Sequence, residues 1–362
     1  MAHKPELFDV HIIIEKEKRA LIHQVKNAAL NNNGIIFGGV VRDEIISSYY
    51  KKYFMNYLTT IGDFDSKEIS EKMWDTTIHN VSSARILVPN NMEVFFNNKI
   101  SYLKFLENIY HKFGKIKVFE NIRDNHLLSL MDNKMNDMIT CTILMIEHII
   151  GKTLTFNGLQ LKFKITVYYI KNVHNGSQII EPPFNCLDMI CNSLIHIKDG
   201  IRLSRCTGTP LDSFTIVEKT KAAHVIMRQI SNYETYICSN FNYEHNKVYI
   251  IKKIMNMIDQ KNGISWKFIN SPYTILKSIK EEECEELYCC ICQEELYDNN
   301  DIAVVYVNDS TGNKIIGSRT HCRCMHQYIL YQTIKAPRVY MCPYKTELKF
   351  VELDIDYTHY KN

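Results

Sequence analysis

The sequence lacks several features that would assign it to a function class at once. Neither charge is in excess, because 43 Lys and Arg residues face 40 Asp and Glu residues and leave a net charge of +3. This balance supplies no overall attraction to nucleic acid, so any phosphate site must be a local cluster. Long apolar runs are also missing, since the longest, residues 138–150, contains Glu147 and His148 and is too short to cross a bilayer. The first residues lack the apolar segment of a signal peptide.

These absences predict an intracellular, cytoplasmic protein with no membrane partner. The chain is also poor in Gly, Pro and Trp and rich in Asn, Ile, Lys and Tyr, a usage typical of AT-rich genomes. That usage suggests a large DNA virus or a protist as the source, in which case a viral replication compartment or the virion is a further location. No internal repeat, low-complexity tract or Gly/Ser linker is found, so domain boundaries must be sought in composition.

Cysteine usage provides such a boundary. The chain has 12 cysteines, which in an intracellular protein are thiols or metal ligands rather than disulfides. Their distribution is uneven, because seven lie near the C-terminus, at positions 284, 289, 290, 292, 322, 324 and 342. The shift predicts a small C-terminal domain at 281–362, preceded by a main domain at 1–180 and its helical continuation at 181–280.

Hydrophobic periodicity predicts an α+β fold, in which helices flank a sheet. Helices are expected at 13–30, 40–50, 99–113 and 127–150, and helical periodicity returns over 185–280. Strands are expected at 35–37, 85–88, 92–96, 152–156 and 159–168. The last two should form a hairpin, because the Asn157-Gly158 pair between them suits a type I′ turn. A polar insertion is expected at 51–82.

The most informative segment is 37–43, in which Gly38 and Gly39 separate an apolar strand from a helix. Glycine permits positive φ and close backbone approach, and the following helix N-terminus offers free N–H groups, so such a turn can hold phosphates. With Arg42 and Asp43 attached, the segment resembles the Gly-Gly-x-Val-Arg-Asp signature of the tRNA CCA-adding and poly(A) polymerase branch of the polymerase β-like nucleotidyltransferases.

A second segment, 188–194, resembles the Asp-Phe-Thr-x-Asn-Ala-Leu motif of the same family, with Asp188 and Asn192 in register. The two segments occur in the order found in the family, and the resemblance covers about residues 10–240. It implies a nucleotidyltransferase fold. It also implies a nucleotide site formed by Gly38, Gly39, Arg42, Asp43, Asp188 and Asn192.

The resemblance further implies three carboxylates that hold two divalent metal ions, which activate the attacking hydroxyl and steady the leaving pyrophosphate. The matching positions are Asn91, Glu93 and Thr166, so only Glu93 is an acid. With two negative charges missing, a two-metal site is under-neutralised. We therefore expect an inactive or severely weakened enzyme, with Mg²⁺ as a cofactor only if activity survives. Acids in the insertion could replace the missing carboxylates, although acidic residues in a polar insertion usually lie on the solvated surface. These acids are Asp63, Asp65 and Asp75.

The arginine pair that precedes the second motif in the family is also missing, because Cys186 and Leu187 stand there. This removes cationic partners for a triphosphate. Other basic residues occur nearby: Lys162, Lys164, Lys171, Arg202 and Arg205. Taken singly, each is interpreted as part of the polar face of a strand or helix rather than as a phosphate ligand. Nucleotide or RNA binding without turnover stays open as an alternative.

The C-terminal segment resembles a RING finger, in which Cys and His side chains bind two zinc ions. The matching groups are Cys-x-x-Cys at 289–292, the Cys/His run at 321–326 and Cys-Pro at 342–343. The resemblance implies a first site from Cys289, Cys292 and His326. It implies a second site from Cys322, Cys324 and Cys342. Each site lacks a fourth ligand, because Ile329 and Lys345 stand where one belongs.

Zinc prefers four thiolate or imidazole ligands in a tetrahedron. The simplest alternative is therefore a single site from Cys289, Cys292, His321 and Cys324. A zinc-free fold of the U-box type, held by salt bridges and hydrogen bonds, is another. In either form the module would bind a protein partner, and in a ubiquitin ligase that partner is a conjugating enzyme.

Three functions follow from these patterns. The first is a non-catalytic scaffold or RNA-processing accessory subunit, favoured because both signatures are recognisable and both have lost ligands. The second is an active Mg²⁺-dependent RNA nucleotidyltransferase, which the lost carboxylates disfavour. The third is a RING-type E3 ubiquitin ligase, which the missing zinc ligands disfavour.

Overall fold

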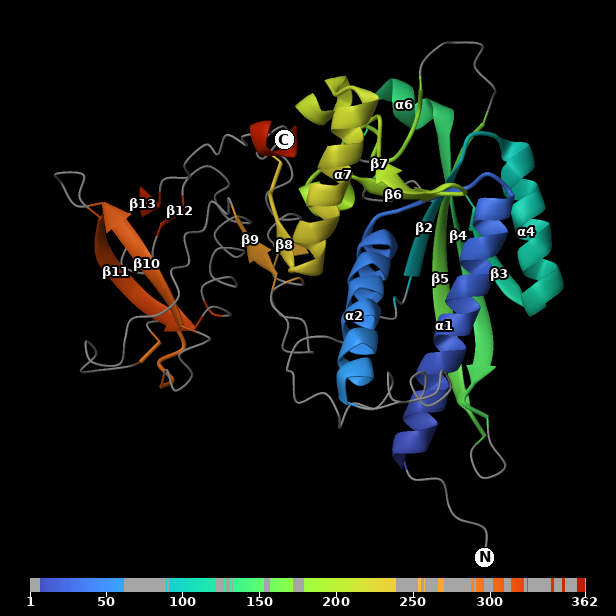
Figure 1. Cartoon of the computed structure of the whole chain (residues 1–362), viewed down its shortest axis with the longest axis horizontal. Coiled ribbons are helices and arrows are strands. Elements are labelled where there is room, and N and C mark those ends of the chain that lie inside the picture. The colour runs from blue at the N-terminus through green and yellow to red at the C-terminus, as the bar shows by residue number, and fades with distance from the viewer. Residues whose placement is uncertain are drawn as a thin grey trace, which may run out of the picture. The chain divides into compact units, whose positions relative to one another are not determined.

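A computed structural model shows how the chain folds (Figure 1). It describes residues 7–61, 89, 91–120, 127, 131, 133–152, 157–171, 179–238, 253–254, 257, 266–269, 288–289, 291–295, 302–308, 314–321, 324, 340–341, 347–348 and 357–361. The chain forms two compact units. The first comprises Met1–Thr235 with Tyr357–Asn362, and the second comprises Tyr236–Asp356.

The first unit is built on a seven-stranded sheet in the order β3-β4-β5-β2-β1-β6-β7. Strands β2 and β5 are parallel, whereas the other neighbours are antiparallel. This mixed sheet with its flanking helices confirms the predicted α+β class. The strands are β1 (Ile35–Phe37), β2 (Asn91–Phe96), β3 (Ile116–Glu120), β4 (Ile139–Ile150), β5 (Leu159–Ile170), β6 (Leu194–Ile197) and β7 (Gly200–Leu203).

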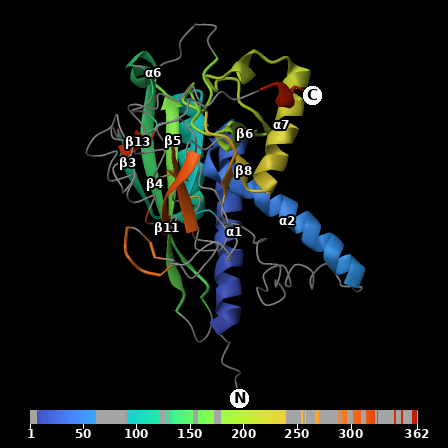
Figure 2. The ribbon, with the colours of Figure 1, turned by 90° about the vertical axis from the view of Figure 1, so that its left-hand side faces the viewer.

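Helices pack beside this sheet. Helices α1 and α4 contact each other and the strands next to them (Figure 1), while α2 contacts α7 (Figure 2). Local signals define two of the ends: Asn98 caps α4 by accepting a 2.8 Å hydrogen bond from the backbone N–H of Ser101, and Thr215 begins α7 with a capping box. The helices are α1 (Leu7–Asn31), α2 (Gly39–Ile61), α4 (Lys99–Phe113), α6 (Asn133–Met138) and α7 (Ile216–Ser231).

Both faces of the sheet are buried around β1. Alternate strand residues project to opposite faces, and Ile35 and Phe37 join one apolar cluster with Phe95 and Phe184. The ring of Phe184 meets that of Phe95 edge-on, with centroids 5.1 Å apart. Ile36, between the two cluster residues, is also buried. The short apolar run 35–37 is therefore an inner strand, as its sequence predicted.

The helix predicted at 127–150 is wrong over most of its length. Within the described part of this range α6 is a short helix, and residues 139–150 form β4, which pairs along its whole length with β5. The predicted hairpin is corrected in the same way: its second strand is β5, but the partner is β4 rather than residues 152–156. Gly158 has φ +85° at the turn between them; residues 153–156 lie outside the described part of the chain.

The helical reading of 185–280 is also wrong in its first part. Strands β6 and β7 occupy 194–203, and β6 pairs with β1, so the sheet extends well beyond residue 180. Helix α7 is the long helix among the described residues of this range. Helix α2 continues to Ile61, into the segment predicted as a polar insertion. The strand predicted at 85–88 lies outside the described residues.

The second unit contains an antiparallel hairpin of β10 (Ile302–Asn308) and β11 (Lys314–His321). A short pair, β12 (Tyr340–Met341) and β13 (Glu347–Leu348), is also antiparallel. The hairpin ends at His321, paired with Ile302, and so brings a predicted metal ligand to a defined position.

Candidate functional site

The predicted turn between strand and helix is present at Gly38. β1 ends at Phe37, and α2 begins at Gly39. Gly38 has φ +74°, and a Cβ atom at this position would lie 2.2 Å from Oε2 of Glu93. The positive φ favours glycine here, and any larger residue would also displace the Glu93 carboxylate. The turn therefore lies directly against the one acid of the predicted catalytic set.

Strand pairing brings the three predicted catalytic positions together. Glu93 lies opposite Phe37 of β1 in antiparallel register and opposite Thr166 of β5 in parallel register. Residues paired across neighbouring strands share a face of the sheet, as do residues two apart along one strand. Asn91, Glu93 and Thr166 thus lie on one face beside Gly38, with Asn91 exposed and Thr166 buried.

The charge of this face is far from that of a two-metal site. Glu93 carries the only carboxylate among the three positions, since Asn91 offers a neutral amide oxygen and Thr166 a hydroxyl. Lys164 lies opposite Asn91 in strand register and adds a positive charge next to it. The acids that could compensate lie outside the described residues: Asp63, Asp65 and Asp75.

The two sequence motifs meet at Arg42, whose side chain is 13% exposed. Its guanidinium forms a hydrogen bond with Cys191 and interacts with the charges of Asp43 and Asp188. Burial opposes the charged form, but these partners outweigh it and hold the pKa of Arg42 above its ordinary value. Burial also raises the pKa of Asp43, against the effect of Arg42. Two segments far apart in sequence are therefore packed together at Arg42.

Asp188 and Asn192 hold the second motif in shape. Oδ1 of Asp188 accepts hydrogen bonds from the backbone N–H of Met189 at 2.7 Å and from Nδ2 of Asn192 at 2.9 Å. Both side chains are buried, and they close the short 3₁₀ helix η1 (Ile190–Asn192). These predicted nucleotide-binding residues therefore bond within the protein and support the Arg42 contact.

The second candidate site is a cluster of three cysteines and one histidine in the second unit. Sγ atoms of Cys289, Cys292 and Cys324 and a ring nitrogen of His321 all lie within 4.8 Å of one another. Nδ1 of His321 is 3.4 Å from Sγ of Cys292 and 3.8 Å from Sγ of Cys324. Ligands about 2.0–2.3 Å from a tetrahedral zinc ion are about 3.5–3.8 Å from one another. The spacing and the donor types therefore suit a metal ion such as zinc.

A tight turn presents the first two ligands. The backbone N–H of Cys289 donates to the carbonyl of Glu294, and that of Gln293 donates to the carbonyl of Cys289, both at 2.8 Å. Gln293 has a left-handed φ of 61°, and Tyr288 and Glu295 close the turn as an antiparallel bridge. This geometry follows from the two-residue gap between the cysteines and aims both thiols to one side.

A backbone carbonyl orients the histidine ligand. Nε2 of His321 lies 3.3 Å from the carbonyl oxygen of Glu295. With the ring proton on Nε2, this nitrogen donates to the carbonyl and leaves the Nδ1 lone pair directed at the three sulfurs. The sequence holds no signal for this contact, because any residue at position 295 has the same carbonyl.

The thiols of the cluster differ in acidity. Burial disfavours the thiolate of Cys289, yet hydrogen bonds from the backbone of Cys292, His321 and Ile291 lower its pKa to about 6. Burial, together with the neighbouring thiols, raises the pKa of Cys324 to about 12. Metal ligands must be thiolates, so Cys289 is closer to its ligating form than Cys324.

The cluster matches the single four-ligand alternative from the sequence. Among the described residues, Cys324 lies with the first pair of cysteines rather than in a separate second site, and His321 supplies the histidine nitrogen. The other predicted ligands, Cys322, His326 and Cys342, lie outside the described residues.

No protein-family model matches this chain, and no curated protein does either. Function must therefore be inferred from the geometry of the two sites. Among the described helices, none combines the length and the hydropathy needed to cross a membrane.

Proposed function

We propose that the protein is a non-catalytic accessory protein. In this proposal the first unit is a nucleotidyltransferase-like scaffold that cannot assemble the two-metal centre of that family. The second unit is a zinc-stabilised module that binds a protein partner. Such a combination suits a subunit of a larger RNA-processing assembly.

The observation that carries the proposal is the register between β2 and β5. It puts Thr166 opposite Glu93 and Lys164 opposite Asn91 on one sheet face. Two divalent cations bring four positive charges, which the family offsets with clustered carboxylates. Here one carboxylate and one ammonium group sum to no net charge. A neutral face supplies neither the affinity nor the geometry for two metal ions, so phosphoryl transfer is not expected.

The Gly38 turn and the Arg42 contact support the scaffold part of the proposal. Gly38 is favoured by its positive φ, and it lets the Glu93 carboxylate approach the turn. Arg42 and Asp188 are engaged with each other and with their neighbours inside the fold. Both features stabilise the packing of α2 on the second motif, and this role persists without catalysis.

The cysteine–histidine cluster supports the module part. Cys289, Cys292, His321 and Cys324 would hold one zinc ion. Bound zinc would supply cross-linking of the two chain segments rather than reactivity, because a fully protein-ligated tetrahedral site has no open position. Ile291 and Cys324 both pack against Cys289, so the ligand turn and its apolar neighbour form one structural element.

A primer-extension assay tests the catalytic part of the proposal. Full-length protein is incubated with an RNA primer and each nucleoside triphosphate, in Mg²⁺ or Mn²⁺, and primer length is followed on gels. We expect no extension above a control without protein. In parallel, Mn²⁺ binding is measured for the wild type and for Asn91→Asp, which returns one acid to the exposed end of the face. The variant should bind Mn²⁺ more tightly than the wild type.

Clear extension by the wild type would contradict the proposal if it depends on the predicted face. Glu93→Ala identifies that dependence, because Glu93 is the acid beside Gly38. Glu107→Ala is the matched control, since Glu107 is an exposed acid of α4. Extension lost in the first variant and kept in the second would establish an active nucleotidyltransferase.

A further inference from the structure

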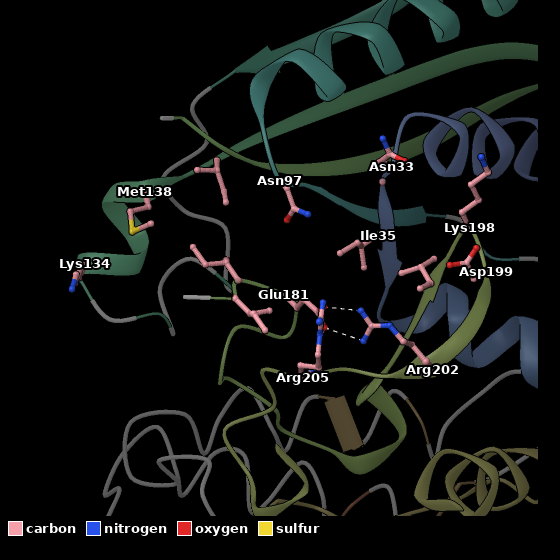
Figure 3. Close-up of a pocket in the computed structure, with 15 residues that line it drawn as sticks. Asn33, Ile35, Asn97, Lys134, Met138, Glu181, Lys198, Asp199, Arg202 and Arg205 are labelled. Atoms are coloured by element: carbon pink, nitrogen blue, oxygen red, sulfur yellow. Dashed lines mark hydrogen bonds and ion pairs between the residues drawn. The ribbon is translucent and has the colours of Figure 1, made fainter. Parts of the chain in front are cut away.

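A cavity of about 680 Å³ opens in the first unit at the end of the sheet away from Gly38 (Figure 3). It is lined where β1 begins, at Asn33 and Gly34, and where β2 ends, at Asn97. Because β1 and β2 are antiparallel, these residues lie at one end of the strands and Gly38 with Glu93 at the other. Gly34 and Gly38 are four residue steps apart along extended chain, which corresponds to about 13 Å. The cavity is therefore distinct from the predicted nucleotide site.

Two arginines are fixed at this cavity by one buried carboxylate. Arg202 donates from both terminal nitrogens to Glu181, at 3.1 and 2.6 Å. Arg205 donates from Nε to Glu181 at 2.8 Å and from its backbone N–H at 3.0 Å, and a further short contact joins its terminal nitrogen to the same carboxylate. The Glu181 side chain is only 2% exposed. Figure 3 shows the three side chains converging at one edge of the cavity.

This arrangement leaves a positive charge facing the cavity. One carboxylate offsets only one of the two guanidinium groups, and the arginine side chains remain 32% and 48% exposed. Each guanidinium carries five N–H donors, of which Arg205 directs only part to Glu181. Lys134 and Lys198 also line the cavity, and Asp199 is the single further acid among its described lining residues. Donors held in place before binding lose little freedom when an anion arrives.

The apolar part of the wall is aliphatic. Aromatic residues are absent from the described lining. The apolar lining residues are isoleucines from several strands and loops and one methionine: Ile35, Met138, Ile170, Ile179, Ile180 and Ile197. A volume of this size is typical of small-molecule sites. Without an aromatic ring to stack on, the wall suits an alkyl body better than a nucleobase.

We propose that this cavity binds a small amphipathic anion, with its head group on Arg202 and Arg205 and a short aliphatic body against the isoleucines. The head group is a carboxylate or a phosphate monoester, since both accept paired N–H donors from guanidinium. The site does not depend on the proposed function, because it uses residues at the opposite end of the sheet.

Titration calorimetry on the full-length protein tests this site with four probes: octanoate, octyl phosphate, octylammonium and ATP. Saturable binding is expected for at least one of the two alkyl anions, and the stronger of them identifies the head group. Octylammonium should not bind, because its charge is repelled. Failure of both alkyl anions, equal binding of octylammonium, or preference for ATP would overturn the proposal.

Two variants and a control assign the binding to the cavity. Arg205→Gln removes one guanidinium and should weaken anion binding by about tenfold, the loss of one charge-assisted contact. Ile179→Trp fills the cavity from a half-exposed position without changing charge, and should abolish binding even if Arg205→Gln disturbs the fold. Arg228→Gln, on the exposed side of α7, should bind as the wild type does. Unchanged binding in Ile179→Trp would contradict the location.

Discussion

Replacing Glu181 by glutamine is the sharpest test of how the arginine pair is held. The wild-type carboxylate accepts hydrogen bonds from the side chains of Arg202 and Arg205 and from the backbone N–H of Arg205. Glutamine keeps the shape and one acceptor oxygen. Its amide group, however, turns N–H donors toward guanidinium donors. Two cations are then left adjacent to each other without their shared counter-charge.

The cost can be bounded from the exposure of the partners. Removing one member of a fully buried ion pair costs about 3–5 kcal/mol. Here the acid is buried, but Arg202 and Arg205 are 32% and 48% exposed. Because both can regain contact with water, we discount the loss in the free energy of unfolding to about 2–4 kcal/mol.

The effect should depend on pH in a defined direction. Burial alone would raise the pKa of Glu181, but the hydrogen bonds from Arg202 and Arg205 outweigh it and lower the pKa below the ordinary 4.5. A lowered pKa in the folded state adds stability that is complete above the unfolded-state value. This stability is lost as the pH falls through the folded-state value. The difference between wild type and Glu181→Gln should therefore be large at neutral pH and shrink below about pH 4.5.

The free energy of unfolding is measured by urea unfolding, followed by hydrogen exchange in β6 and β7. Because both strands belong to the first unit, the measurement reports on that unit alone. Wild type and Glu181→Gln are compared at about pH 7 and about pH 3, with Glu107→Gln as the control. Glu107 is 69% exposed, so its substitution should change the free energy of unfolding by less than about 0.5 kcal/mol. A Glu181→Gln protein as stable as the wild type at neutral pH would refute the reasoning. A difference that persists unchanged in acid would refute it as well.

Three further predictions follow from single contacts. Gly38→Ala should lower the free energy of unfolding of the first unit by more than about 1 kcal/mol in urea, because Gly38 has a positive φ. Adding Glu93→Ala to this variant should recover part of the lost stability. Equal loss in the single and the double variant would contradict the 2.2 Å contact. Cys289→Ser should reduce the zinc bound per chain, measured by atomic absorption, whereas Cys186→Ser in the first unit should not. Equal zinc content in the wild type and in both variants would exclude the cluster as the zinc site. Thr215→Ala should weaken α7 by about 1 kcal/mol in hydrogen exchange, since it removes a capping box; unchanged exchange would exclude that role.

Local signals were sufficient where the sequence carries its own boundaries. Helix α4 was predicted with its observed ends, because Asn98 caps one end and Gly114 ends the other. The short strand at 35–37 and the turn at Gly38 follow from an apolar triplet and two glycines. In each case the deciding residues lie within a few positions of the element.

Burial on both faces removed the signal at β4. Most residues of 139–150 are buried, and only His148 and Ile149 are exposed. An inner strand of this kind reads as a continuous apolar run without period-two alternation, and such a run does not distinguish strand from helix. The pairing of β4 with β5 over its full length decides the matter, and no local pattern predicts that partner.

Metal-ligand spacing identified the donors but not their grouping. Cys289 and Cys292 were predicted to act together, because two residues separate them. His326 was predicted for the RING-like site and His321 for the single-site alternative, and the position of His321 depends on β11, which ends there in pairing with Ile302. The grouping of the ligands thus depends on the register of the β10–β11 hairpin, which the spacing of the cysteines does not predict.

The cavity shows the same limit in its strongest form. Sequence reasoning explained Arg202 and Arg205 as the polar face of an element, and it did not single out Glu181. Their partnership depends on β7 and the segment before the second motif meeting beside β1, which requires the sheet order β1-β6-β7. A buried carboxylate destabilises the fold unless its cationic partners are held beside it. The sheet order holds the two arginines there, so a site of this kind can be recognised only once the strand pairing is known.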